Sequence, residues 1–190
     1  MENFKAFTTH FAALTEKEMT DLKDLFEPMS VKKMDHVLVS GTYVKELFFF
    51  NKGTFRVYHL KDGEEFTTKF LYAPCIYAEL FSIRKVMPTF FNIQALNDCD
   101  CYKANFVKIE KLFETSPNIR RLFLKLYEHI YMKTAKRQVS FILDSQSKRY
   151  ANLLAEFPNI INEIPLQYIA SFIGVKPETL SRIRRKSKER

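Results

Sequence analysis

A run of polar side chains near the C-terminal end of the sequence has the types and the spacing that contact nucleic acid. One expected helix carries hydroxyls, a carboxylate and cations on its outer face or at its end: Glu178, Thr179, Ser181, Arg182, Arg185 and Lys186. The amide of Gln167, in the helical stretch before it, joins this set. Such groups can hydrogen-bond base edges in a major groove, and the cations can bind phosphates. Seven basic and two acidic residues between Lys176 and Arg190 give this stretch a net charge of +5. The pattern predicts a DNA-binding helix; the alternative is a basic helix that only faces solvent.

The residues around this helix indicate how it is held. Small and apolar side chains recur at helical spacing in two short stretches: Ile169, Ala170, Ile173, Leu180 and Ile183. Gly174 lies between the stretches, and glycine can take the positive φ that a tight turn after a helix needs. Pro177 follows, and its fixed φ suits the first turn of a second helix. This order of residues is typical of a helix–turn–helix unit.

The run GVKPETLSRI, from Gly174 to Ile183, resembles the recognition-helix signature of the Crp/Fnr family of bacterial transcription regulators. Glu178, Thr179 and Arg182 match that signature, whereas Pro177 stands where the family often has an arginine that reads bases. The resemblance implies a regulator that binds double-stranded DNA as a homodimer, with RNA polymerase as a further partner. Because Glu178 lies four residues before Arg182 on one helical face, we expect Arg182 to read a guanine edge with Glu178 beside it.

Composition narrows the class of protein. The 190 residues are 46% hydrophobic, which favours a folded chain, and the net charge of +8 favours an anionic partner.

The three cysteines, Cys75, Cys99 and Cys101, are too few for the four-cysteine iron–sulfur site of some Crp/Fnr relatives, and we expect no metal site or cofactor. No nucleophile–base pair or glycine-rich phosphate loop is recognisable, so we expect no enzyme. Without a recognisable secretory signal or membrane span, the sequence predicts a cytoplasmic protein.

Short strands are expected over residues 29–104. They fall at regular spacing, at 37–39, 47–51, 54–60, 65–72, 90–96 and 99–104. Asp62-Gly63 predicts a hairpin turn between two of them, and the whole pattern predicts an antiparallel barrel or jelly roll. The order resembles the cyclic-nucleotide-binding β-roll of the Crp/Fnr family. The expected α+β architecture has a β-roll sensor domain, a long dimerisation helix and a helix–turn–helix domain, at residues 1–116, 117–143 and 144–190.

A segment inside the expected β-roll resembles the site that binds the cyclic phosphate in family members that take up cyclic AMP. Glu79 is kept, but Thr89 stands where the resemblance calls for a phosphate-binding arginine, and Phe90 replaces a small residue. Arg84 is close enough in sequence to supply that charge from another direction. We expect no tight binding of cyclic AMP. Two alternatives stay open: a different small-molecule effector, or no effector, with Phe90 and Phe91 filling the space. The residues expected to line the pocket are Glu79, Leu80, Arg84, Thr89 and Phe90.

The expected long helix carries apolar residues at helical spacing: Ile119, Leu122, Phe123, Leu126, Ile130 and Phe141. The resemblance implies that this helix pairs with its copy in a homodimer. The alternative is that it packs only on its own β-roll, since Tyr131, Lys133 and Arg137 interrupt the stripe.

Beyond a domain boundary near 144–146, we expect a helix at 147–157 and a brief strand at 159–164. The segment 158–164 is short, so the wing hairpins that flank the two helices in winged family members are expected to be missing. The missing wing and Pro177 support a second interpretation. In that interpretation the chain is a ligand-binding or protein-interaction module whose helix–turn–helix unit does not bind DNA specifically.

Overall fold

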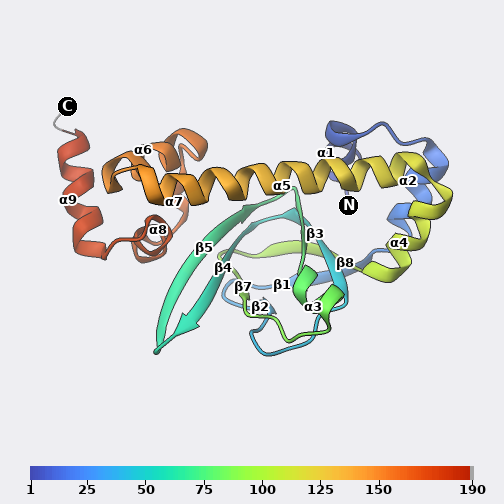
Figure 1. Cartoon of the computed structure of the whole chain (residues 1–190), viewed down its shortest axis with the longest axis horizontal. Coiled ribbons are helices and arrows are strands. Elements are labelled where there is room, and N and C mark those ends of the chain that lie inside the picture. Colours follow the sequence, from blue (N-terminus) through green and yellow to red (C-terminus); the bar gives the residue numbers. More distant parts are fainter. Residues whose placement is uncertain (189–190) are drawn as a thin grey trace. The chain divides into compact units, whose positions relative to one another are not determined.

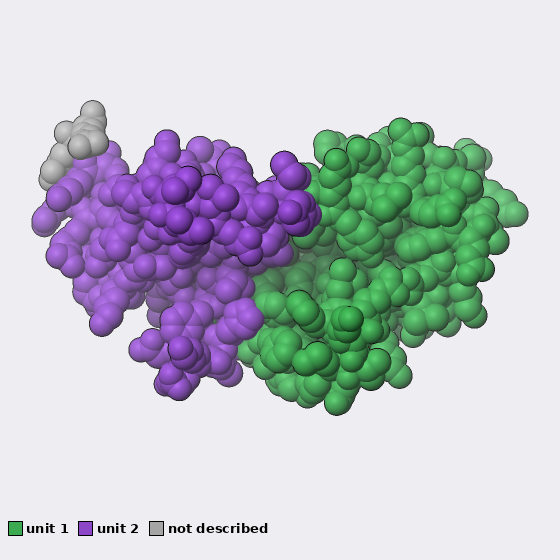
Figure 2. All heavy atoms as spheres, viewed as in Figure 1, with its two compact units in different colours: residues 1–57, 70–130 green, residues 58–69, 131–190 purple. Residues whose placement is uncertain are grey.

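The computed structural model describes residues 1–188, which fall into two compact units (Figure 2). The first unit contains Met1–Val57 and Phe70–Ile130. The second contains Tyr58–Lys69 and the chain from Tyr131 onward. The division therefore passes through a β-hairpin and through the longest helix, whereas the sequence placed the boundary near 144–146.

Within residues 1–188, eight strands form two four-stranded sheets, in the orders β1-β8-β3-β6 and β2-β7-β4-β5 (Figure 1). The strands are β1 Glu27–Val31, β2 His36–Leu38, β3 Glu46–Lys52, β4 Thr54–Lys61, β5 Glu64–Tyr72, β6 Cys75–Ala78, β7 Asn92–Ala95 and β8 Cys99–Asn105. Strand β8 pairs antiparallel with both β1 and β3, and β2 pairs antiparallel with β7. The expected α+β class with an antiparallel, jelly-roll-like domain is confirmed.

Three consecutive phenylalanines on β3 build two separate cores. Successive side chains of a strand point to opposite faces of its sheet. Phe48 and Phe50 join one buried cluster with Phe55 and Ile93 of the other sheet. Phe49 points to the opposite face and joins a second cluster, which is covered by helices. A shift of β3 by one residue would exchange these faces, so the two cores fix its register.

The second core is covered by α1 Phe4–Phe11, α2 Glu16–Lys23, α4 Phe106–Thr115 and the first half of α5 Pro117–Leu143. Thr15 and Glu18 form a capping box at the start of α2. The Glu18 carboxylate also accepts hydrogen bonds from the Ser116 hydroxyl and the Asn118 amide. These bonds, led by the one from Ser116, lower the pKa of Glu18 to about 2. Glu18 thus ties α2 to the junction of α4 and α5.

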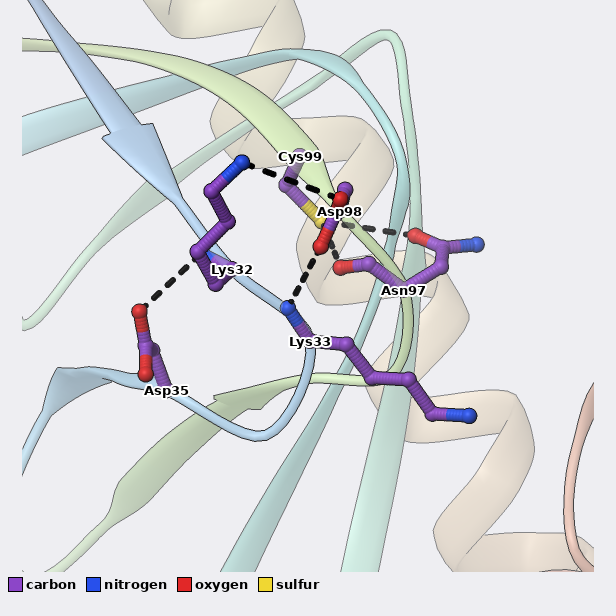
Figure 3. A network of polar contacts seen from close by, with 6 residues as sticks. All are labelled: Lys32, Lys33, Asp35, Asn97, Asp98 and Cys99. Atoms are coloured by element: carbon purple, nitrogen blue, oxygen red, sulfur yellow. Dashed lines mark hydrogen bonds and ion pairs between the residues drawn. The ribbon is translucent and has the colours of Figure 1, made fainter.

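A polar network holds the turns at one end of the sheets (Figure 3). The Lys33 amide donates to Asp98 Oδ1 at 2.9 Å, which joins the β1–β2 turn to the β7–β8 turn. Asn97 Oδ1 accepts from the Thr54 amide at 2.9 Å, and the Cys99 thiol donates to the Asn97 carbonyl at 3.0 Å. A Cβ on Gly53 would lie 2.3 Å from Cys99 Sγ, so only glycine fits beside this thiol. The network fixes the point from which β4 and its hairpin start.

The helices of the second unit are the rest of α5, then α6 Gln146–Glu156, α7 Ile160–Glu163, α8 Leu166–Ile173 and α9 Pro177–Lys188. The brief strand expected at 159–164 was wrong, because this segment contains the helical turn α7. Ile160 and Ile164 lie four residues apart and are both buried, whereas the two residues before Ile164 are exposed. That is the burial pattern of a helical turn. Within residues 1–188, no helix is both long and apolar enough to cross a bilayer.

Candidate nucleic-acid interface and effector region

Helices α8 and α9 form a helix–turn–helix pair in the second unit (Figure 1). Gly174 ends α8 with φ of 73°. Its amide donates to the Ser171 carbonyl, and the Val175 amide donates to the Ala170 carbonyl at 3.0 Å. This is a Schellman turn, which satisfies the last carbonyls of α8. The residues expected on the inner faces are all buried: Ile169, Ala170, Ile173, Leu180 and Ile183.

The outer face of α9 presents the side chains that the sequence assigned to DNA. Glu178, Ser181, Arg182, Arg185 and Lys186 are exposed, Thr179 is half-buried, and Gln167 is exposed near the start of α8. Arg182 Nη2 donates to Thr179 Oγ1 at 3.4 Å, and the Ser181 hydroxyl donates to the Pro177 carbonyl. The structure therefore brings the candidate contact residues of α9 onto one helical surface that is open to solvent.

Arg184 and Lys188 are two further basic residues of α9. Arg184 is half-buried and hydrogen-bonds Tyr150 of α6. That bond helps to position α9 on α6. The Lys188 side chain lies outside the described residues.

Two arginines hold the end of α8, a role that their positions in the sequence do not reveal. Arg137 Nη2 donates to the Phe172 carbonyl at 2.8 Å, and Arg149 Nε donates to the Ile173 carbonyl at 2.9 Å. The Arg137 guanidinium lies 3.7 Å from the centre of the Phe172 ring. Both guanidiniums also stack on Phe141, at 4.7 and 4.8 Å from the ring centre. We call these four residues the arginine clamp.

The clamp places positive charge at the C-terminal end of α8, where the helix dipole favours cations. Burial, and then repulsion from Arg149, lowers the pKa of Arg137 to about 10, so the Arg137 guanidinium is still charged at neutral pH. A Cβ on Gly174 would lie 2.8 Å from Phe141 Cε1. The clamp and the turn of the helix–turn–helix pair therefore pack as one structure.

In the first unit, Glu79 occupies the position expected for an effector contact, but its carboxylate is already bonded. It is 2% exposed and caps α3 Leu80–Lys85 by accepting from the Phe81 amide at 3.1 Å. The Tyr77 hydroxyl donates to its other oxygen at 3.1 Å. Burial, and then the charge of Glu79, raises the pKa of Tyr77.

The other expected pocket residues do not converge on one site with Glu79. Arg84 forms a bidentate pair with Glu110 and lies over the Phe106 ring. Thr89 is buried, and its hydroxyl accepts from the Phe91 amide. Leu80 and Phe90 are 37% and 50% exposed. The Phe90 ring contacts Phe81 at the surface, whereas Phe91 packs against the inner core.

Arg56 is the largest fully buried side chain in residues 1–188, and the sequence did not predict its burial. It lies on β4, and its Nε and Nη2 both donate to Gln94 Oε1 of β7, at 2.9 and 2.6 Å. Gln94 Nε2 in turn donates to the Met34 carbonyl at 3.0 Å. A buried guanidinium needs such partners, because an unpaired charge in the interior is costly. In the sequence Arg56 is one cation in an alternating strand, and nothing marks it as buried.

Metal binding and cysteine chemistry depend on how the possible ligands and the thiols are arranged and buried in the part of the chain that the structure describes. No group of three or more histidine, cysteine or acidic side chains is arranged to hold a metal ion within residues 1–188. Cys99 and Cys101 are buried in the inner core. Burial raises the pKa of the Cys101 thiol to about 12, so it carries little of the reactive thiolate at neutral pH.

Comparisons with known proteins support the fold described above. Residues 28–116 match the family model of the cyclic nucleotide-binding domain. No curated protein sequence matches the chain. Among solved structures, a Crp/Fnr-family transcriptional regulator from Eubacterium rectale aligns with a TM-score of 0.71 at 19% identity, over 99% of this chain and 88% of that one. The chain has the fold of a Crp/Fnr-type regulator.

Two further structures with this fold are similar over most of their length. CLP, described as a c-di-GMP-responsive global regulator from Xanthomonas campestris, has a TM-score of 0.72 at 12% identity and 90% coverage of both chains. A variant of CooA from Carboxydothermus hydrogenoformans has a TM-score of 0.72 at 18% identity, over 92% of this chain and 81% of that one.

Helix α5 has two different apolar faces. Ile119, Leu122 and Leu126 are buried in the helix-covered core of their own unit, so the stripe read from the sequence is not a dimer seam. The reason is that their face meets the outer side of the first sheet. A second face, in the part of α5 that belongs to the second unit, leaves large apolar side chains in solvent: Tyr131 71%, Met132 62%, Val139 52% and Ile142 80% exposed.

Proposed function

We propose that this protein is a DNA-binding transcription regulator of the Crp/Fnr type that acts as a homodimer. The observation that carries the proposal is the outer face of α9. Its polar and cationic side chains are exposed on a helix whose inner face, turn and preceding helix are fully packed. A rigid helix with this surface suits a major groove, and its net positive charge suits phosphate.

Roles on α9 divide along the helix. Arg182 is exposed one turn from the start, with Thr179 holding its guanidinium, so it reads a guanine edge. Glu178 lies on the same face and accepts from a cytosine amino group or orients Arg182. Arg185 and Lys186 follow where the helix leaves the groove and bind phosphates, as does Gln167 at the start of α8.

The dimer in this proposal uses the second apolar face of α5. Tyr131, Ala135, Val139 and Ile142 recur at intervals of three and four residues, which is the spacing of a helix–helix seam. Pairing this face with its copy would cover side chains that are otherwise 52–80% exposed. Two recognition helices related by a two-fold axis then meet half-sites about 34 Å apart on a pseudo-palindrome.

The sensor domain of the proposed regulator does not bind cyclic AMP tightly. Thr89 is buried with its hydroxyl bonded to a backbone amide, and Arg84 is paired with Glu110, so neither presents charge to a cyclic phosphate. An effector of other chemistry and contact with RNA polymerase stay part of the proposal as partners. Calorimetric titration with cyclic AMP should show no binding at micromolar concentrations.

The experiment that tests the function is selection of bound duplexes from random DNA with the purified chain. A recovered pseudo-palindrome supports the proposal. On the selected site, Arg182→Ala should cost about 1–3 kcal/mol and flatten discrimination at one base pair. The matched change Lys186→Ala should weaken all sequences about equally and lower the salt slope by about one phosphate contact.

The alternative is a ligand-binding or protein-interaction module whose helix–turn–helix pair does not bind DNA specifically. It predicts that the selection enriches no sequence and that retained DNA is lost at moderate salt. Uniform loss of affinity in Arg182→Ala would show instead that Arg182 contacts phosphate only.

A further inference from the structure

The outer part of the β4–β5 hairpin belongs to the same compact unit as the helix–turn–helix pair (Figure 2). The hairpin closes with Asp62 and Gly63, both at positive φ, 53° and 79°. That is the conformation of a two-residue hairpin turn. Strand β5 is the edge of its sheet, so one side of its backbone has no neighbouring strand. An edge of this kind is open to other partners.

Ser171 of α8 is that partner. Its hydroxyl accepts from the Thr67 amide at 2.8 Å and donates to the Glu65 carbonyl at 3.1 Å. These are the donor and acceptor that a further strand would have used. A hydroxyl can do both at once, which an alanine or a carboxylate cannot. The two bonds attach the hairpin to the first helix of the DNA-binding pair.

The position of this attachment matters for DNA. Ser171 lies four residues after Gln167, so the two share one face of α8. The attached hairpin tip, residues 61–65, contains one basic residue, Lys61, and three acidic residues, Asp62, Glu64 and Glu65, so its net charge is −2. The adjoining helix α9 is strongly basic. A phosphate backbone that approaches the Gln167 face of α8 therefore meets an acidic segment where cations are needed.

We propose that the β4–β5 hairpin is an autoinhibitory latch on α8, held by Ser171, and that DNA binding requires its release. The proposal rests on the DNA-binding function proposed above. Strand β4 begins and strand β5 ends in the first unit, whereas the tip between them belongs to the second unit, so one hairpin links the two proposed functions along the chain. A signal that moves the hairpin then changes the fraction of molecules that can bind DNA.

The test compares Ser171→Ala with the unmodified chain on the duplex recovered by selection. Removing the hydroxyl breaks both latch bonds while alanine keeps the helix, so affinity should rise about 5- to 10-fold. Thr20→Ala is the control, because the Thr20 hydroxyl donates to the Glu16 carbonyl within α2. It should leave DNA affinity unchanged.

Charge and latch can be separated in a double-mutant cycle. Glu64→Gln with Glu65→Gln should raise affinity in the unmodified chain, most at low salt. In the Ser171→Ala background the same pair should add little, because the released tip no longer lies beside the DNA. Equal gains in both backgrounds would mean that the acidic residues act only through long-range charge, and would overturn the latch.

Hydrogen exchange supplies a readout that does not depend on any variant. The Thr67 amide should be protected in the free protein and should lose protection when the selected duplex is bound. If the unmodified chain binds the duplex, but Ser171→Ala does not bind more tightly or Thr67 stays protected, the latch is wrong and the proposed function stands. If no form of the protein binds any duplex at low salt, both are wrong.

Discussion

Replacing Arg149 with methionine should loosen the helix–turn–helix pair while leaving the first unit intact. Methionine keeps most of the length and apolar volume of the side chain but removes three interactions. These are the bond from Nε to the Ile173 carbonyl at 2.9 Å, the bond from Nη1 to the Asp144 carbonyl at 2.8 Å, and the stack on Phe141. The first bond satisfies a carbonyl at the end of α8, and the second holds the junction of α5 and α6.

The magnitude follows from these contacts. A hydrogen bond from a charged group contributes about 1.5–3 kcal/mol net, and a partly buried cation–π contact contributes about 1 kcal/mol. The two bonds and the contact sum to about 4–7 kcal/mol. This sum is reduced by about half, because Arg149 is only half-buried and because Arg137, which is destabilised by the charge of Arg149, gains from its removal. We therefore expect a loss of about 2–4 kcal/mol in the free energy of opening α8 and α9.

The assay is amide hydrogen exchange measured residue by residue. A loss of about 2–4 kcal/mol corresponds to exchange that is about 30- to 1000-fold faster in α8 and α9, since about 1.4 kcal/mol is tenfold. Amides of β3 and β8 should not change. The matched control is Lys148→Met, which removes an exposed cation from the neighbouring position of α6. A rise of less than about threefold in α8, or equal effects of the two variants, would refute the reasoning.

Two further predictions concern α5 and α2. Ile142→Glu, at an 80% exposed position, should convert the proposed dimer to monomer in sedimentation without changing the free energy of unfolding. Leu126→Ala, at a 3% exposed position, should cost about 2–4 kcal/mol of stability without changing association. A monomeric unmodified chain at high micromolar concentration would contradict the dimer. Because the folded-state pKa of Glu18 is lowered from 4.5 to about 2, its contribution is present above pH 4.5 and is lost as the pH falls towards 2. Glu18→Gln should remove that part of the pH dependence of unfolding, and an unchanged acid limb would show that Glu18 does not contribute.

Local sequence signals predicted the helix–turn–helix pair because its determinants are neighbours in the chain. Gly174 needs positive φ, and Pro177 begins the next helix; both are properties of single residues. Six of the eight strands in residues 1–188 were predicted for the same reason, from short apolar runs and from turn signals such as Asp62-Gly63, whereas β1 and β6 were not predicted. Where the spacing of apolar residues along the chain distinguishes a helix from a strand, the element can be predicted from the sequence.

The contacts that the sequence could not reveal join residues far apart in the chain. The stripe of Leu122 and Leu126 and the stripe of Val139 and Ile142 are both apolar, and only the position of the first sheet decides which one is buried. Arg137 reaches a carbonyl 35 residues away, and no local spacing marks that reach. Phe90 and Phe91 are identical neighbours, yet one is half exposed and the other packs inward.

The two attachments of α8 differ in strength, and the difference indicates which one moves. The arginine clamp holds the C-terminal end of α8 with charged donors and stacked rings, which are strong interactions. Ser171 holds the hairpin with two bonds between neutral groups, each of which contributes about 0.5–1.5 kcal/mol. A force on the hairpin therefore breaks the Ser171 bonds before it breaks the clamp. On this proposal, helices α8 and α9 stay packed together at the end of α5, and the change at the proposed DNA-binding face is the departure of the acidic tip.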